Sequence, residues 1–96
     1  MLIQMEIKQK DDSENGMFYI EQNGETIAEM TYTWAGADRI IIDHTEVDGS
    51  LKGQGVGKQL VTKAVEFARA KHLKIVPACS FAKRVFAQTP EFKDVL

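Results

Sequence analysis

The first half of the chain alternates apolar and polar residues, and the second half changes to a helical spacing. Between residues 28 and 34 every second residue is apolar, and the residues between them are Glu29, Thr31 and Thr33. This alternation predicts an antiparallel strand with one buried face. The same pattern, divided by polar turns, predicts four strands over residues 5–8, 17–22, 25–34 and 39–47. Asn23-Gly24 predicts a tight hairpin between the second and third of them.

The helical spacing begins after residue 55. Apolar residues recur three and four positions apart through about Lys71, at Leu60, Val61, Ala64, Val65 and Ala68. This spacing predicts an amphipathic helix that packs on the sheet. A short apolar run at 74–76 predicts a fifth strand, and residues 81–88 predict a last helix that ends before Pro90. A strand, a helix and a strand in succession imply a parallel crossover, so we expect an α+β fold with a mixed sheet of about five strands.

Composition narrows the class of protein. With 96 residues, 44% of them hydrophobic and 27% charged, the chain is expected to form one domain over residues 1–96. Its net charge of -2 argues against a broad nucleic-acid-binding surface. No apolar run approaches the ~20 residues that span a bilayer, and residues 1–4 are too short for a signal peptide. We therefore expect no nucleic-acid or membrane partner and a cytoplasmic location, with Met5 as an alternative start to Met1.

Cysteine usage excludes two further classes. Cys79 is the one cysteine of the sequence, so the chain has no intramolecular disulfide and no cysteine-based zinc site. No metal site is predicted.

Three glycines stand at alternate positions just before the predicted helix, at Gly53, Gly55 and Gly57. Glycine opens backbone conformations that other residues avoid, and it removes side chains that would keep an anion away from the amide N–H groups. The unpaired N–H groups and the dipole at the start of a helix favour a negative ligand there. The run predicts a phosphate cradle, with an ordinary glycine-rich loop as the alternative.

The spacing of this run excludes two common phosphate loops. A nucleotide-triphosphate loop reads G-x-x-x-x-G-K-[ST], but Lys52 stands five residues before Gly57, and Gln59 follows Lys58. A dinucleotide-binding loop reads G-x-G-x-x-G after a βαβ unit, and neither the spacing nor the unit is present. The cradle therefore belongs to neither class.

The loop resembles the cofactor loop of the GNAT superfamily of acetyl-CoA-dependent N-acetyltransferases, whose signature is [QR]-x-x-G-x-[GA]. Lys52 stands at the first position of that signature, Gly55 at the central glycine and Gly57 at the last. Lysine keeps the charge but lacks the bidentate fork of arginine. The resemblance implies that acetyl-CoA or coenzyme A binds here, on Val47 through its backbone and on Lys52, Gly53, Gln54, Gly55, Val56, Gly57 and Lys58.

The predicted order of elements strengthens the resemblance, because the GNAT fold also has antiparallel strands, a cofactor loop with its helix, and a parallel strand that splays to admit the pantetheine arm. The segment from Ile75 to Phe81, followed by Phe86 and Thr89-Pro90-Glu91-Phe92, resembles a minimal single-domain subfamily with a cysteine after the parallel strand. The polar turn at 11–16 replaces the helices that cover the acceptor side in larger members, and the usual final hairpin is missing. A truncated GNAT-like fold with an open acceptor side is expected.

Cys79 and His44 are the predicted catalytic residues. Cys79 follows the fifth strand, at the sheet edge where open α/β sheets place ligands, and its thiol is suited to accept the acetyl group or to protonate the departing CoA. The tyrosine that usually donates this proton in the family is replaced by Phe86. The imidazole of His44 is suited to take a proton from an amine or from Cys79, with Asp43 or Glu46 as its orienting partner or as the base. Strict alternation places His44 and Glu46 on one face and Asp43 and Thr45 on the other.

Less specific roles are also open for both residues. A lone cysteine can be an apolar core filler, and a strand histidine can be hydrogen-bonded within its sheet. The sequence therefore predicts an acetyl-CoA-binding N-acetyltransferase-like protein that moves acetyl from CoA to an unidentified amine, on a small molecule or a protein, directly or through Cys79. A noncatalytic acyl-CoA-binding or sensing module is the alternative.

Overall fold

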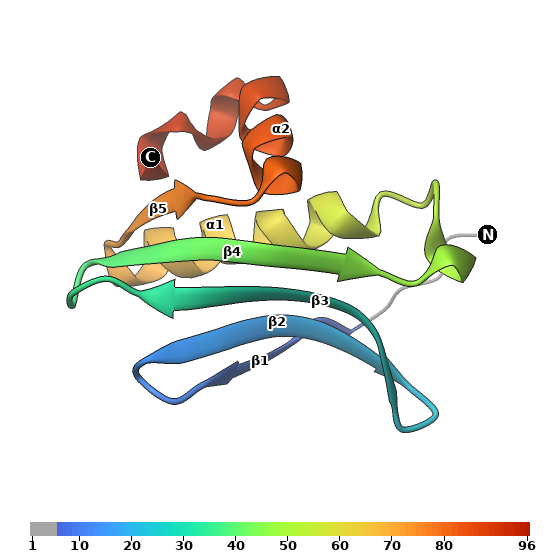
Figure 1. The fold of residues 1–96 in the computed structure, drawn as a ribbon. Coiled ribbons are helices and arrows are strands. Elements are labelled where there is room, and N and C mark those ends of the chain that lie inside the picture. The colour runs from blue at the N-terminus through green and yellow to red at the C-terminus, as the bar shows by residue number, and fades with distance from the viewer. Residues whose placement is uncertain (1–5) are drawn as a thin grey trace.

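A five-stranded mixed sheet forms the centre of the fold (Figure 1). The computed structural model describes residues 6–96. The strands follow one another across the sheet in the order of the sequence, as β1 (Lys8–Asp11), β2 (Asn15–Gln22), β3 (Glu25–Trp34), β4 (Arg39–Val47) and β5 (Lys74–Pro77). The first three pairings are antiparallel, and β4 pairs with β5 in parallel. The predicted α+β class and the parallel crossover are confirmed.

Two helices pack against this sheet, and there are two short 3-10 turns, one after β4 and one after α2. The helices are α1 (Val56–Lys71) and α2 (Ser80–Gln88), and the 3-10 turns are η1 (Gly49–Leu51) and η2 (Pro90–Val95). The apolar stripe of α1 is completely buried, as predicted, at Leu60, Val61, Ala64, Val65 and Ala68. None of the helices between residues 6 and 96 is both long and apolar enough to cross a bilayer.

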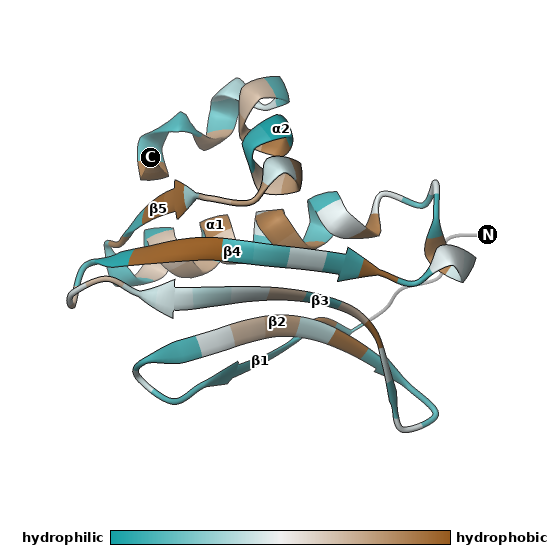
Figure 2. Ribbon diagram, viewed as in Figure 1, coloured by the Kyte–Doolittle hydropathy of each residue, from teal (hydrophilic) through white to brown (hydrophobic). Residues whose placement is uncertain are grey.

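The two faces of the sheet differ in polarity. We call the face toward α1 the inner face and the opposite one the outer face. The inner face carries Met30 and Tyr32, both buried, and the outer face carries Thr31 and Thr33. Along β4 the chain changes from hydrophobic to hydrophilic near its middle (Figure 2). This change marks the point at which β4 stops being a core strand.

The first strand lies later in the chain than the sequence pattern predicts. β1 shares only Lys8 with the predicted strand at 5–8, and Met5 lies outside the described residues. Side-chain hydrogen bonds explain the shift, because the Asp11 carboxylate binds groups of β3 and so holds this end of β1 in the sheet. The turn that follows is tied by the Asp12 carboxylate, which accepts from the backbone N–H of Asn15 at 2.7 Å.

A bulge in β4 breaks the predicted alternation. Tyr32 pairs with Ile42, but Thr31 pairs with His44, so Asp43 is an extra residue in the strand. The Asp43 carboxylate accepts hydrogen bonds from the Thr31 and Thr33 hydroxyls on the outer face. Asp43 therefore lies on the outer face together with His44. Strict alternation predicted that Asp43 would instead share a face with Thr45.

Candidate functional site

The loop before α1 is held by backbone geometry. Asp48 caps η1, where its carboxylate accepts from the Ser50 N–H at 3.0 Å. Gly53 and Gly55 then take left-handed conformations, with φ of 82° and 70°, which other residues rarely adopt. Gly55 is the N-cap of α1 and offers no side-chain cap.

The first turn of α1 leaves backbone donors without protein partners. Among the described residues, no acceptor binds the N–H groups of Val56, Gly57 and Lys58, and the first paired N–H is that of Gln59, which donates to the Gly55 carbonyl at 3.1 Å. Unpaired N–H groups of this kind, together with the positive end of the helix dipole, form an anion site. The first turn of α1 therefore has the free backbone donors that the predicted cradle requires.

A pocket of about 350 Å³ opens beside this cradle. The charged residues that line it are Lys52, Lys58 and Arg84, all of them basic. Its floor includes Val47 at the end of β4, and its far wall is formed by Phe81, Val85 and Gln88 of α2 and by Thr89, which follows this helix. Three cations and a row of free N–H groups make this pocket complementary to a polyanion such as a pyrophosphate.

Most of the predicted cofactor residues meet in this pocket, with one exception. Val47, Lys52, Gly53, Gly55, Val56, Gly57 and Lys58 line it, but Gln54 does not. The Gln54 side-chain amide turns back toward η1, where it lies 3.5 Å from the Ser50 carbonyl oxygen.

The structure explains why residue 57 is a glycine, which the sequence did not reveal. A Cβ at this position would lie 2.3 Å from the ring tip of Phe81, so glycine is what allows α2 to set an aromatic ring over the first turn of α1. Phe81 is 36% exposed and forms part of the pocket wall. This contact has only two signals in the sequence, the glycine at position 57 and the aromatic residue Phe81 near the start of α2.

The parallel strands part at the end of the pocket. Pairing between β4 and β5 ends at Ile42 and Pro77, where the Ile42 carbonyl accepts from the N–H groups of both Ala78 and Cys79, at 2.9 and 3.1 Å. Beyond this point no strand among residues 6–96 pairs with the outgoing half of β4 on that side. Unpaired strand edges offer backbone donors and acceptors to an extended ligand.

Cys79 lies where the strands part. It is the N-cap of α2, and its Sγ accepts from the Ala82 N–H at 3.3 Å. The same sulfur lies 3.5 Å from the hydroxyl of Thr45, which the bulge turns to the inner face opposite Met30. Cys79 is partly buried, so the thiol is held in place yet can be reached. Thr45 is a neighbour that the sequence identified only as part of a strand.

His44 lies on the other side of the sheet from this thiol. It pairs with Thr31 on the outer face, its side chain is 59% exposed, and its Nε2 lies 3.4 Å from Glu46. The structure therefore brings His44 and Glu46 together, as predicted, and gives Cys79 a threonine as its polar neighbour.

Known proteins resemble this chain in sequence over most of its length. A family described as GCN5-related N-acetyl-transferase matches residues 17–95. Protein NATD1 from Xenopus tropicalis is 26% identical over 85 residues, which are 88% of this chain and 78% of that protein. Protein NATD1 from Mus musculus is 26% identical over the same share of this chain and 77% of its own length.

Solved structures agree with these matches. A GCN5-like candidate N-acetyltransferase from Staphylococcus aureus is 42% identical, with a TM-score of 0.75 over 95% of this chain and 86% of that one. A ribosomal-protein-alanine N-acetyltransferase from Brucella melitensis, at 16% identity, shares the fold with a TM-score of 0.66 over 80% of this chain and 63% of that one. With its loop, its parting strands and these relatives, the chain belongs to the GCN5-related N-acetyltransferase family.

Proposed function

We propose that the protein binds acetyl-CoA in the pocket between the glycine loop and α2, with the pyrophosphate on Gly53–Lys58. The observation that carries this proposal is the combination of free N–H groups on the first turn of α1 with three basic side chains around one pocket. The left-handed glycines support it further, since an added Cβ at Gly53 or Gly55 meets no protein atom within 4 Å. That space is available to phosphate oxygens.

The same proposal gives a role to the parting strands. The unpaired edge of β4, from Asp43 to Val47, is suited to bind the amide groups of a pantetheine arm through the backbone. An arm that follows this edge away from the loop leads to Thr45 and Cys79, which lie in hydrogen-bond range of each other. Backbone donors aimed at a developing oxyanion contribute on the order of 2.7–4 kcal/mol in acyl transfer, so the edge also serves catalysis.

We further propose that the protein transfers acetyl to an amine, with Cys79 as the group that the acetyl passes through. Bound acetyl-CoA supplies an activated thioester. The Cys79 sulfur attacks the thioester carbon, the carbon–sulfur bond to CoA breaks, and the departing sulfur takes the thiol proton, which leaves an acetylated cysteine and free CoA. The acceptor nitrogen then attacks this new thioester and restores the thiol. In this scheme Cys79 replaces the missing hydroxyl at Phe86, and His44 takes the proton of the amine.

Binding is tested by melting temperature. Saturating CoA is expected to raise it, since a ligand that binds only the folded state at about one hundred times its Kd contributes about 2.7 kcal/mol. No shift in melting temperature with CoA or acetyl-CoA would refute the proposal.

The location of the protein in the cytoplasm stays a prediction from the sequence.

Transfer is tested by intact mass and by release of free CoA thiol over time. With acetyl-CoA, the wild type is expected to gain one acetyl group, and the Cys79→Ala variant is expected to gain none while it still responds to CoA in melting temperature. An adduct that persists in Cys79→Ala would refute the cysteine route. Binding without CoA release, with or without an amine panel, would leave the protein as an acyl-CoA-binding module.

A further inference from the structure

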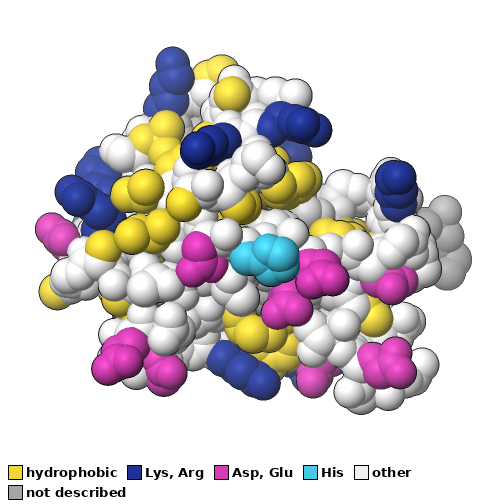
Figure 3. Space-filling model, viewed as in Figure 1, with side chains coloured by type: hydrophobic (Ala, Val, Ile, Leu, Met, Phe, Trp, Pro, Cys, Tyr) yellow, Lys and Arg dark blue, Asp and Glu magenta, His cyan; other side chains and the backbone are white. Residues whose placement is uncertain are grey.

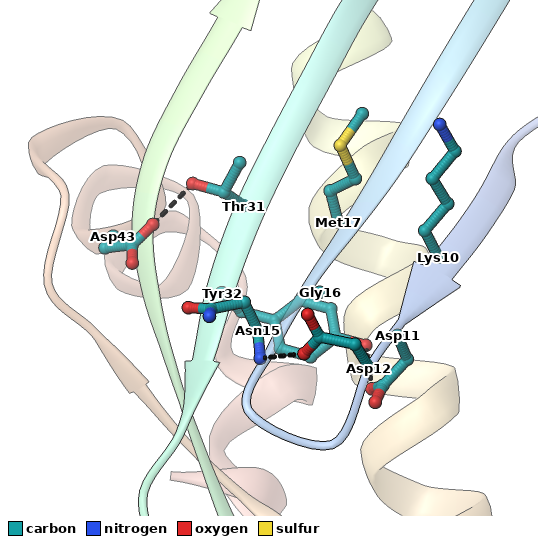
Figure 4. A pocket seen from close by; sticks show the side chains of 9 residues that line it. All are labelled: Lys10, Asp11, Asp12, Asn15, Gly16, Met17, Thr31, Tyr32 and Asp43. Carbon is teal, nitrogen blue, oxygen red and sulfur yellow. Dashed lines mark hydrogen bonds between the residues drawn. The ribbon is translucent and has the colours of Figure 1, made fainter.

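The outer face of the sheet carries a groove that the cofactor pocket does not use. It has a volume of about 540 Å³, and side chains from β1, β2, β3 and β4 surround it (Figure 4). Lys10 pairs with Met17, Met17 with Thr31 and Thr31 with His44. These four residues form one row across the outer face. The groove therefore leads from β1 to the strand that borders the opening beside β5.

Three carboxylates, those of Glu29, Asp43 and Glu46, gather near the β4 end of this row. Glu29 on β3 stands directly opposite Glu46 on β4, an arrangement of like charges that destabilises a sheet. Among residues 6–96, no lysine or arginine forms a salt bridge with Glu29, Asp43 or Glu46. Acidic side chains flank a histidine in the middle of this face (Figure 3). Lys10 stands at the β1 end of the row, so it is the β4 end of the face that attracts cations and repels anions.

We propose that this outer face is the acceptor site and that its occupant is a lysine-bearing segment of a basic protein. The inference rests on the proposed acetyl transfer, because it names the acceptor for that reaction. Charge complementarity supports it, since a basic segment would neutralise the opposed glutamates and Asp43 together. Openness supports a protein over a small amine, because the His44 and Glu46 side chains are 59% and 70% exposed and no helix of residues 6–96 covers this face (Figure 1).

The geometry gives each part of a lysine side chain a place. The apolar stem can lie over Met17, as lysine stems commonly do on apolar surface. The ammonium would lie beside Asp43, whose carboxylate is fixed in the bulge by the Thr31 and Thr33 hydroxyls. Asp43 is also the first β4 residue beyond the last pair with β5. An amine at this position stands at the mouth of the opening that holds Cys79.

The proton balance fits the same residues. The ammonium gives one proton to His44, which Glu46 holds at 3.4 Å. The neutral nitrogen then forms a bond to the acyl carbon of acetylated Cys79, the carbon–sulfur bond breaks, and the cysteine sulfur takes the second proton. The products are an acetylated lysine and the free thiol.

The test uses a fluorescent peptide with one lysine among arginines and glycines, and a matched peptide with glutamates in place of the arginines. Anisotropy is measured on the full chain with and without CoA, for the wild type and for the double variant Glu29→Gln/Glu46→Gln. The control is Glu66→Gln/Glu91→Gln, which removes the same charge from α1 and η2. We expect the basic peptide to bind better than the acidic one, and its affinity to fall roughly fivefold to tenfold in the outer-face variant alone. Salt should weaken the binding.

Other outcomes would overturn the inference. Equal affinity for the two peptides, or equal losses in the two double variants, would show that the outer face does not select a basic segment. Spermidine that displaces the peptide and is acetylated faster would assign the face to a small polyamine. The CoA-induced rise in melting temperature is measured in the same three proteins and is expected to be equal. Its absence from the wild type would refute the proposed function, whereas a normal rise without selective peptide binding would refute only the acceptor.

Discussion

Glycine has opposite structural roles in two regions of this protein, the loop before α1 and the hairpin between β1 and β2. In the loop, Gly53 and Gly55 adopt φ of 82° and 70°, and an added Cβ would meet no protein atom within 4 Å. In the hairpin, a Cβ on Gly16 would lie 2.2 Å from the Tyr32 ring. The loop glycines thus leave room for a group from outside the chain, and Gly16 leaves room for a side chain that folding puts there.

The polar groups of the two regions differ in the same way. In the hairpin, the Asp11 carboxylate accepts from the Tyr32 hydroxyl at 2.5 Å and from the Trp34 indole at 2.9 Å, and that hydroxyl accepts from Gln9 at 2.8 Å. Burial and the bond to Asp11 raise the pKa of Tyr32, so it stays a neutral donor. In the loop, the N–H groups of the first α1 turn find no such partners in the part of the chain that the structure describes. Folding therefore satisfies the polar groups of the hairpin, whereas it leaves these donors of the loop without a protein partner among residues 6–96.

The largest expected effect is therefore on stability, from Gly16→Ala in the hairpin. The Tyr32 ring is 1% exposed and cannot swing away, so overpacking should cost about 3 kcal/mol and lower the melting temperature by roughly 15 °C. Gly49→Ala is the matched control, because a Cβ at Gly49 meets nothing within 4 Å. Thermal and urea unfolding of both variants give the comparison.

A double-mutant cycle identifies the cause of that loss. In a Tyr32→Leu background the ring is gone, and Gly16→Ala should then cost much less than in the wild type. The same cost in both backgrounds would mean that the Tyr32 ring is not what excludes a side chain at Gly16.

The second effect is on binding, from Gly55→Val in the loop. A branched residue in a left-handed conformation should cost about 1–2 kcal/mol of stability, and its side chain would fill the space proposed for phosphate. We expect CoA affinity to fall at least tenfold, as measured by calorimetry. Gly24→Val has the same kind of backbone strain, at φ of 80° with no atom within 4 Å, and should lose stability without loss of affinity. Equal loss of affinity in both variants would remove the loop from the binding site.

The contrast also explains which parts of the fold were predictable. Local patterns decided β3, β4 and α1, because alternation, turn residues and helical spacing are all written in neighbouring positions. The observed bounds of β3 and β4 are those predicted, Glu25–Trp34 and Arg39–Val47. The position of β1 depends on Tyr32 and Trp34, which lie more than twenty residues away from Asp11. No local pattern contains that information.

The candidate site also has a part that local sequence patterns predict and a part that they do not. A glycine loop and the residues around it are contiguous, so the sequence identified the lining of the pocket at one side. The other wall comes from α2, and Phe81 was not among the predicted residues. The bulge at Asp43 was also beyond reach, since it depends on hydroxyls from Thr31 and Thr33 across the sheet. Strict alternation therefore assigned Asp43 to the wrong face.

A smaller effect is expected where the two walls of the pocket meet. Gly57→Ala should push the Phe81 ring aside, and because the ring is partly exposed it can move at a cost below that of Gly16→Ala. We expect CoA affinity to fall a few-fold with little change in melting temperature. In a Phe81→Leu background the added methyl should have no further effect on affinity. Additive losses would show that the contact between the two residues does not shape the pocket.

The smallest effect is on acid stability, and it compares one carboxylate from each region. Burial raises the pKa of Asp11, but hydrogen bonds from Tyr32, Ser13 and Trp34 outweigh it and lower the pKa below its ordinary value. Such a group stabilises the fold above its unfolded pKa of about 3.9, and this contribution is lost as pH falls through the lower native pKa. The pKa of Asp48 is also lowered, by hydrogen bonds from Ser50 alone.

Melting temperature is therefore measured between about pH 5 and pH 2 for the wild type, Asp11→Asn and Asp48→Asn. Asp11 joins β1 to β3, whereas Asp48 binds only a residue two positions away. Asp11→Asn should consequently be less stable than the wild type at pH 5 and should lose fewer degrees on acidification. Asp48→Asn should follow the wild-type curve more closely. If Asp48→Asn flattened the curve more than Asp11→Asn, the loop rather than the hairpin would be the region that side-chain bonds hold, and the contrast between them would be reversed.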